Sequence, residues 1–357
     1  MKKKFLFLMF FLILISLVGC KKSGYNNIVK DLDKKIQKAN SYKLSGILEI
    51  TNNEDTYQYD VEVSYKKEDN YRVSLINKSN NHEQIILKNS EGVFVVTPSL
   101  NKSFKFQSDW PNNNSQIYLL HSIIKDIKTD DDKQVEEKDG KYIFTTKVKY
   151  PNNNQLVKQK ITIDKNLKID KIEVINADNI MQMSMTINNI EYGSKFNDDY
   201  FDLNSIVNEI DNNLANKNEN LNEGLKEEKN EEKTEEDKKT ESTSSIEDII
   251  YPLYIPTGTT LSQQEKVAKT DGERIILTFD GEKPFLLVEE NSSISDEFDI
   301  VPTLGEPYFL TDTIAALTNN SLTWSSNGID YYIVSDTLSQ TELIEIASSI
   351  TAIPTIK

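Results

Sequence analysis

Residues 57–65 read YQYDVEVSY and alternate large apolar with polar side chains without a break. Successive side chains of a β-strand point to opposite faces, so this period of two predicts a strand with one buried and one solvated face. Similar runs occur at residues 42–51, 71–77, 84–88, 93–97, 141–149, 156–163, 169–175 and 181–192, and Asp139-Gly140 supplies a two-residue hairpin turn. The first half of the chain is therefore predicted to be an antiparallel meander.

Two helices are expected to accompany these strands. Apolar residues recur at helical spacing between charged ones over residues 27–40, which predicts an amphipathic helix. Ser115, just after Trp110-Pro111, is expected to cap a second helix, which carries Ile117, Leu119, Leu120, Ile123, Ile124 and Ile127. This second helix is apolar over so wide an arc that it should lie inside a curved sheet.

The N-terminus has the pattern of an export signal. Three lysines precede an apolar run from Phe5 to Val18, which is about 21 Å long as a helix and too short for a bilayer core of roughly 30 Å. Leu17-Val18-Gly19-Cys20 looks like the lipobox of bacterial lipoproteins, in which the thiol of Cys20 receives diacylglycerol, with palmitate among the acyl chains. We expect residues 1–19 to be a signal peptide and residues 20–25 a lipidated tether. An unmodified Cys20 beside an ordinary cleavage site is the alternative.

The second half of the chain begins after a linker. Residues 204–245 are rich in Asn, Glu, Lys, Ser and Thr and are expected to form a disordered acidic linker, either a solvated tether that lets the halves move or an interaction tail. Residues 246–357 are expected to form a small α+β domain, with strands at 275–279, 285–289, 321–325 and 329–335. Asn327-Gly328 predicts a hairpin turn, and Ser339 with Glu342 predicts a capping box before a final helix.

Charge is distributed unevenly along the chain. Residues 246–357 carry 5 Lys/Arg against 18 Asp/Glu, a net of −13, whereas residues 1–215 carry 30 against 29. Because an acidic domain repels phosphate backbones, nucleic acid is not expected as a partner.

The sequence offers no catalytic centre, metal site or cofactor motif. Two His and one Cys exclude nearly every multi-ligand zinc site and every disulfide framework. His82 lacks a second His at helical spacing, and His121 is expected to be a partly buried structural residue. Asp130-Asp131-Asp132 lacks the Gly and Glu that a calcium loop requires. We therefore expect no enzyme, although a peptidoglycan enzyme that uses only carboxylates stays open as an alternative.

Met181, Met183 and Met185 lie on one face of a predicted strand. Flexible thioethers adapt to different apolar ligands, so together with Leu120 and Ile124 of the inner helix they could line a cavity for an acyl chain. The alternative is that they fill the core beneath that helix.

The lipobox, the N-terminal helix, the long antiparallel run, residues 108–120 (SDWPNNNSQIYLL) and the ending Asp198-Asp199-Tyr200-Phe201 together resemble the LolA/RseB-like lipoproteins of spore-forming bacteria, which include the germination lipoprotein GerS family. The resemblance covers about half of the chain. It implies an α+β fold, a curved antiparallel half-barrel with helices on its concave face over residues 26–203, followed here by the second small α+β domain. It also implies a lipid-binding cavity or a protein-binding surface. The carrier proteins hold their plug with an arginine for which this half offers only Arg72.

These observations predict a membrane-anchored, non-catalytic binding module for a protein partner or an apolar ligand, in sporulation or spore germination. The partner that the resemblance implies is a cortex-modifying amidase or another envelope protein. The expected location is the outer face of the cytoplasmic membrane, including that of the forespore or spore envelope. The alternative is a two-domain envelope sensor similar in plan to RseB.

Overall fold

The structure is a computed structural model that describes residues 22–52, 55–150, 152–212, 246, 249–269, 272–294, 297–310 and 312–350. The expected signal peptide, Cys20 and residues 213–245 of the expected linker lie outside these ranges.

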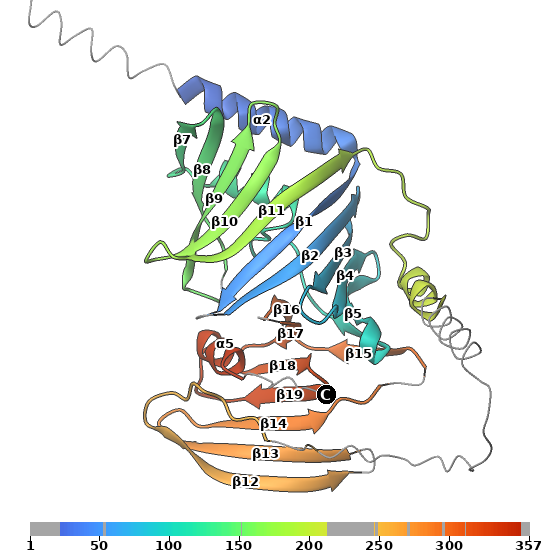
Figure 1. The fold of residues 1–357 in the computed structure, drawn as a ribbon, viewed down its shortest axis with the longest axis vertical. Coiled ribbons are helices and arrows are strands. Elements are labelled where there is room, and N and C mark those ends of the chain that lie inside the picture. Colours follow the sequence, from blue (N-terminus) through green and yellow to red (C-terminus); the bar gives the residue numbers. More distant parts are fainter. Residues whose placement is uncertain are drawn as a thin grey trace, which may run out of the picture.

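The first half is an open, strongly curved sheet with helices against it (Figure 1). Two of its helices are α2 (Lys22–Ala39) and α3 (Leu120–Thr129), and it has a short 3-10 turn η1 (Pro98–Leu100). Its strands are β1 (Ser41–Asn52), β2 (Asp55–Lys66), β3 (Asn70–Asn77), β4 (Glu83–Asn89), β5 (Gly92–Thr97), β6 (Lys102–Phe106), β7 (Gln134–Lys138), β8 (Lys141–Lys147), β9 (Leu156–Asp164), β10 (Ile169–Asn176) and β11 (Met181–Tyr192). The strand order β6-β5-β4-β3-β2-β1-β11-β10-β9-β8-β7 confirms the predicted antiparallel half-barrel.

The period of two in residues 57–65 places one set of side chains inside the curve of the sheet. Tyr59, Val61, Val63 and Tyr65 are all buried and belong to one core cluster with residues of α2 and α3. Figure 1 shows α2 lying across one end of the curved sheet. The helices thus fill the concave side, as expected.

The inner helix begins four residues later than a cap at Ser115 predicts. Ser115 does not cap it, because the N–H of Ser115 donates to the Lys149 carbonyl and its Oγ accepts from the Lys149 N–H, both at 2.8 Å. These two bonds hold Ser115 in an extended bridge to the chain after β8. The helix starts instead at Leu120, preceded by an extended Leu119 without a side-chain cap.

The convex side of β4 and β5 is also covered. Residues 203–212, of which all but Leu203 belong to the expected linker, are helical, and they pack on the outside of the sheet together with Phe201. The apolar contacts come from Phe201, just before the helix, and from Leu203, Ile206 and Ile210, which lie at helical spacing. The first half therefore extends beyond residue 203, because these apolar residues, with the partly buried Val207, hold the helix against the sheet.

The second half is a seven-stranded antiparallel sheet with one helix against it. Its strands are β12 (Thr259–Lys269), β13 (Gly272–Gly281), β14 (Phe285–Asn291), β16 (Glu306–Phe309), β17 (Ile314–Leu317), β18 (Ser321–Ser326) and β19 (Ile329–Val334), and its helix is α5 (Gln340–Ser348). The order is β12-β13-β14-β19-β18-β17-β16. The predicted turn joins β18 to β19, with positive φ at both Asn327 and Gly328.

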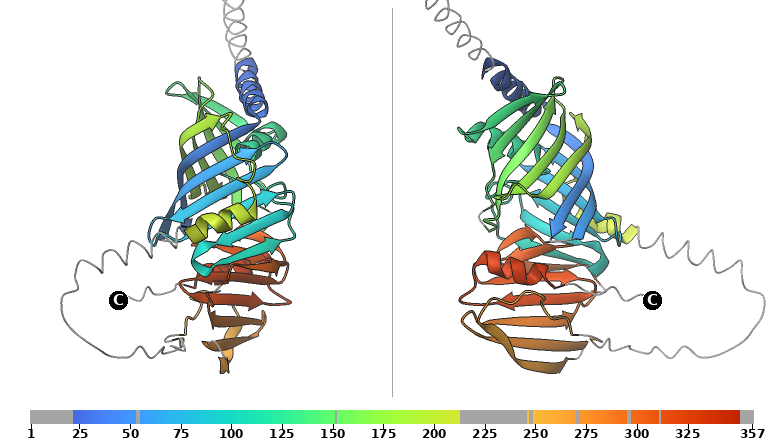
Figure 2. Two further views of the ribbon diagram at one scale, coloured as in Figure 1. Left: turned by 90° about the vertical axis from the view of Figure 1, so that its right-hand side faces the viewer. Right: turned by 60° about the vertical axis from the view of Figure 1, so that its left-hand side comes forward.

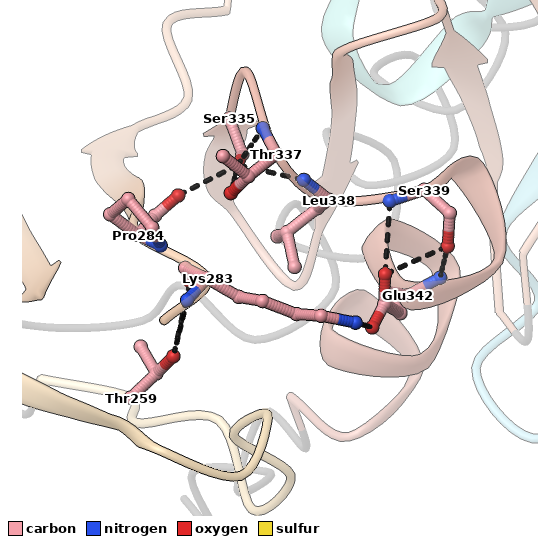
Figure 3. A network of polar contacts seen from close by, with 8 residues as sticks. All are labelled: Thr259, Lys283, Pro284, Ser335, Thr337, Leu338, Ser339 and Glu342. Atoms are coloured by element: carbon pink, nitrogen blue, oxygen red, sulfur yellow. Dashed lines mark hydrogen bonds and ion pairs between the residues drawn. The ribbon is translucent and has the colours of Figure 1, made fainter. Parts of the chain in front are cut away.

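The capping box before α5 is confirmed. The Glu342 N–H donates to Ser339 Oγ at 3.3 Å, and Glu342 Oε2 accepts the Ser339 N–H at 3.0 Å (Figure 3). Lys283, from the turn between β13 and β14, donates to the same carboxylate. The helix is therefore attached to the sheet at its first turn.

Candidate binding site at the junction of the two halves

A strand from the second half joins the half-barrel. β15 (Asp299–Thr303) pairs in parallel with β6, from Asp299 opposite Lys102 to Thr303 opposite Phe106. This strand makes the first sheet twelve-stranded, and the second sheet lies beyond the end of the half-barrel opposite α2 (Figures 1 and 2). A tether between the halves predicts that they can move relative to one another, whereas in the structure they share a sheet.

The hairpin β16–β17 packs into the mouth of the half-barrel. Ile314 and Ala316 are buried in the core cluster of the first half. Phe309 packs edge-on against Tyr59 of β2, with ring centroids 5.1 Å apart. The core of the half-barrel is therefore completed by the second half.

A buried amide connects the two halves at this place. Gln84, on β4, accepts the Ile314 N–H at 2.7 Å and the Thr313 hydroxyl at 3.3 Å through its Oε1, while its Nε2 donates to Thr97 at 3.4 Å. Because an amide both donates and accepts, one side chain satisfies polar groups of both halves.

A carboxylate of the second half adds a second polar contact. Glu306, at the start of β16, accepts hydrogen bonds from Ser108 and, at 2.6 Å, from the amide of Asn113. Ser108 and Asn113 belong to the loop that carries Trp110-Pro111. The loop before the inner helix is thus held by the second half.

Inside the mouth lies a cavity of about 70 Å³. Its walls come from both halves and include Leu48, Ile50, Ile86, Trp110, Ile117, Tyr118, Met183, Pro307, Tyr308, Phe309 and Ile314. A water molecule takes about 30 Å³ of liquid volume, and ligand pockets usually measure roughly 300–1,000 Å³. The cavity as it stands is therefore too small for an acyl chain.

A larger groove opens beside it, with a volume of about 390 Å³. Its apolar lining includes Ile50, Leu156, Met183, Tyr308, Phe309 and Ile344, and its polar lining includes Asn153, Gln155, Gln182, Thr341, Glu345 and Ser349. The wall from the half-barrel consists of the ends of β1, β9 and β11 and the turn before β9, and the opposite wall includes β16, α5 and Tyr254. Apolar side chains with amide and hydroxyl groups among them suit a peptide, which presents side chains and backbone hydrogen-bonding groups together.

The structure separates the residues predicted to line a cavity. Met183 lines both the cavity and the groove, and Met181 is half-buried at the start of β11. Met185, Leu120 and Ile124 are buried in the core and are not among the lining residues of either space. Met185 in particular packs against Gly46, where an added Cβ would lie 2.6 Å from its terminal methyl.

His121 lies among three tyrosine rings on the concave side. Its ring centroid is 4.4 Å from that of Tyr65, 5.9 Å from Tyr42 and 6.5 Å from Tyr71. Burial lowers the pKa of His121, and its Nδ1 is buried without a hydrogen-bond partner in the described chain. This position fits the structural role expected from the sequence. In the part of the chain that the structure describes, no three His, Cys, Asp or Glu side chains gather in a way that could hold a metal ion.

Arg72 does not hold the inner helix. It lies on the convex side, where its guanidinium donates both Nη groups to Glu209 of the 203–212 helix, at 3.1 and 2.5 Å, and stacks over Tyr200 at 4.9 Å. It therefore fastens the last helix of the first half to the outside of the sheet. No sequence pattern pointed to this pair.

Glu289 is a buried carboxyl in the second half. It is fully buried on β14 opposite Tyr331, and its Oε2 accepts the Ile250 N–H at 3.2 Å. Burial raises its pKa to about 7. The stretch around residue 250, which follows the expected linker, is thus bound to a titratable group in the core.

Among the described residues, the helices are too short or too polar to cross a bilayer. No protein-family model matches the chain. The sporulation protein YdcC of Bacillus subtilis (strain 168) is 34% identical to it over 339 residues, which cover 95% of this chain and 94% of that protein.

Three solved structures illustrate the structural similarities. A chain of the Pseudomonas aeruginosa MucA/MucB complex is 10% identical, with a TM-score of 0.30, and covers 90% of this chain and 98% of its own. A chain of the complex between the CwlD amidase and the GerS lipoprotein of Clostridioides difficile is 20% identical, with a TM-score of 0.29. The match covers 49% of this chain and 96% of that one. A LolA superfamily protein from Nitrosomonas europaea is 11% identical, with a TM-score of 0.31. The match covers 50% of this chain and 98% of that one. The LolA superfamily and GerS, which the sequence resembles, are thus among these neighbours.

Proposed function

Because the chain belongs to the family of the sporulation protein YdcC, we propose that it is a non-catalytic binding protein of the cell envelope that acts in sporulation. Diacylglycerol on the thiol of Cys20 would hold it on the outer face of the cytoplasmic membrane, since two acyl chains anchor a protein where one does not. The groove at the junction would hold an extended segment of a protein partner. A cortex-modifying amidase is the partner class that the sequence resemblance implies.

One observation supports a protein partner over a lipid ligand. The concave side of the half-barrel is filled by α2, α3 and the β16–β17 hairpin, and the cavity that is left measures about 70 Å³. The groove outside it is more than five times larger, at about 390 Å³. It also has polar groups on both walls that can pair with a peptide backbone.

Site-specific photocrosslinking in sporulating cells tests this proposal. A photoreactive residue placed at Gln155 or Thr341, on opposite walls of the groove, is expected to give the same adduct, identified by mass spectrometry. Gln263, exposed on β12 and outside the groove lining, is the matched control position. Equal adducts from Gln263, or extractable lipid in the purified protein without any adduct, would contradict the proposal. Metabolic labelling with a fatty acid, compared with Cys20→Ser, tests the anchor separately.

The sensor similar in plan to RseB is the second candidate, and the shared walls of the groove favour it. A partner in the groove contacts both halves, so it can shift their contact if its affinity differs between two arrangements. The Ile314 N–H, which donates to Gln84, reports on that contact. Hydrogen exchange at Ile314 should change on partner binding for a sensor and stay constant for a passive module.

A further inference from the structure

Helix α2 has two different faces. Val29, Leu32 and Ile36 are buried in the core of the half-barrel. On the opposite side Lys30, Lys34 and Lys38, each four residues from the next, form one exposed line that we call the lysine ridge. Like charges four residues apart destabilise a helix by a few tenths of a kcal/mol per pair. Helix stability therefore does not account for the ridge.

The ridge differs from the other lysines near this end of the half-barrel. Lys128 pairs with Asp33 at 2.6 Å, Lys141 pairs with Asp170 at 2.8 Å, and Lys165 lies 3.4 Å from Glu137. The three ridge lysines have no ion pair with any described residue, although Asp31 is exposed beside them. Their charges are therefore free to bind an anionic surface.

The position of the ridge in the molecule indicates that this anionic surface is the membrane. α2 begins at Lys22, two residues after Cys20, and lies across the end of the half-barrel (Figure 1). The second half, with its net charge of −13, lies beyond the other end. An anionic bilayer would attract the ridge and repel the second half.

We propose that the lysine ridge of α2 binds the anionic headgroups of the membrane and so holds the protein upright, with the second half and the groove directed away from the bilayer. This extends the proposed envelope location, but the contact is made by lysines and needs no acyl chain. A juxtamembrane lysine contributes roughly a fivefold gain in binding, so three contribute on the order of a hundredfold.

Vesicle sedimentation of the full mature chain with Cys20→Ser tests the contact without the anchor. Vesicles of equimolar phosphatidylglycerol and phosphatidylcholine should bind the protein, and vesicles of phosphatidylcholine alone should not. Binding should weaken as salt is added, because the Debye length falls to about 8 Å at physiological ionic strength. The triple variant Lys30→Gln, Lys34→Gln, Lys38→Gln should lose binding by on the order of a hundredfold, to the level of neutral vesicles.

The matched control is the triple variant Lys149→Gln, Lys158→Gln, Lys160→Gln, which removes the same charge from exposed positions away from α2. It should bind like the parent. Equal binding by the ridge variant and the parent, or equal loss in both variants, would overturn the proposal. Thermal melting checks that the ridge variant is folded. Its melting temperature should not fall, because the substitutions remove like charges from α2. Groove crosslinking does not depend on this outcome, so failure of the ridge and failure of the proposed function are distinguishable.

Discussion

Gln84 is the side chain whose replacement tests most directly how the halves are joined. It is 7% exposed, and its Oε1 is the acceptor for the Ile314 N–H and the Thr313 hydroxyl. Gln84→Met keeps the length of the side chain and removes this acceptor, which leaves two buried donors of the second half without a partner. A buried donor left unsatisfied costs about 1–3 kcal/mol. We therefore expect the free energy of unfolding to fall by at least about 1 kcal/mol.

Gln155→Met is the matched control for this experiment. Gln155 also spans the junction, donating to Glu345 at 2.9 Å, but both side chains reach solvent, where water replaces a lost bond. Surface changes of this kind stay within about 0.5 kcal/mol. Urea unfolding of both variants, with hydrogen exchange at Ile314, measures the difference. If Gln84→Met unfolds with the same free energy as Gln155→Met, the buried amide does not join the halves and the reasoning fails.

Two further predictions concern the second half. Burial raises the pKa of Glu289 to about 7, above the usual 4.5, so the folded state binds more protons than the unfolded state between these values, and stability should fall as pH rises from about 5 to 7. Glu289→Gln should remove this slope in urea titrations at several pH values, and an unchanged slope would contradict the assignment. Pro302, on β15, faces away from β6, because the Asp299 N–H donates to Asn101 and alternate residues of a parallel strand face the same neighbour. Pro302→Val should add a backbone N–H that points away from the sheet, and so promote self-association in sedimentation velocity. Thr303→Val should not, because the backbone N–H of residue 303 faces β6.

The parts of the fold that the sequence predicts correctly are those with a strong local signal. The alternation in residues 57–65 and the turn Asp139-Gly140, which has positive φ at both residues, act over a few positions and agree with the structure. Strands β7 and β12 lack that signal, since they lie at sheet edges and are exposed along nearly their whole length. With no buried face, an edge strand needs no alternation.

The junction could not be predicted for a different reason. Gln84 and Ile314 are 230 residues apart, and a hydrogen bond at that separation leaves no periodic pattern. In the sequence, a Gln on a strand looks like any solvent-exposed polar residue, and nothing shows that it is buried against a distant partner. The helix at residues 203–212 did carry a signal, the spacing of Leu203, Ile206 and Ile210, which its Asn- and Asp-rich composition obscured.

The shared core opposes any separation of the two halves. Separation would expose Ile314, Ala316 and Phe309 to water, break the pairing of β15 with β6, and leave Gln84 unpaired. Each of these changes opposes opening, so the joined arrangement is the ground state. A partner that opens the junction must bind the separated halves more tightly than the joined ones by at least that difference. A partner that only fills the groove needs no such excess, which is why hydrogen exchange at Ile314 separates a sensor from a passive module.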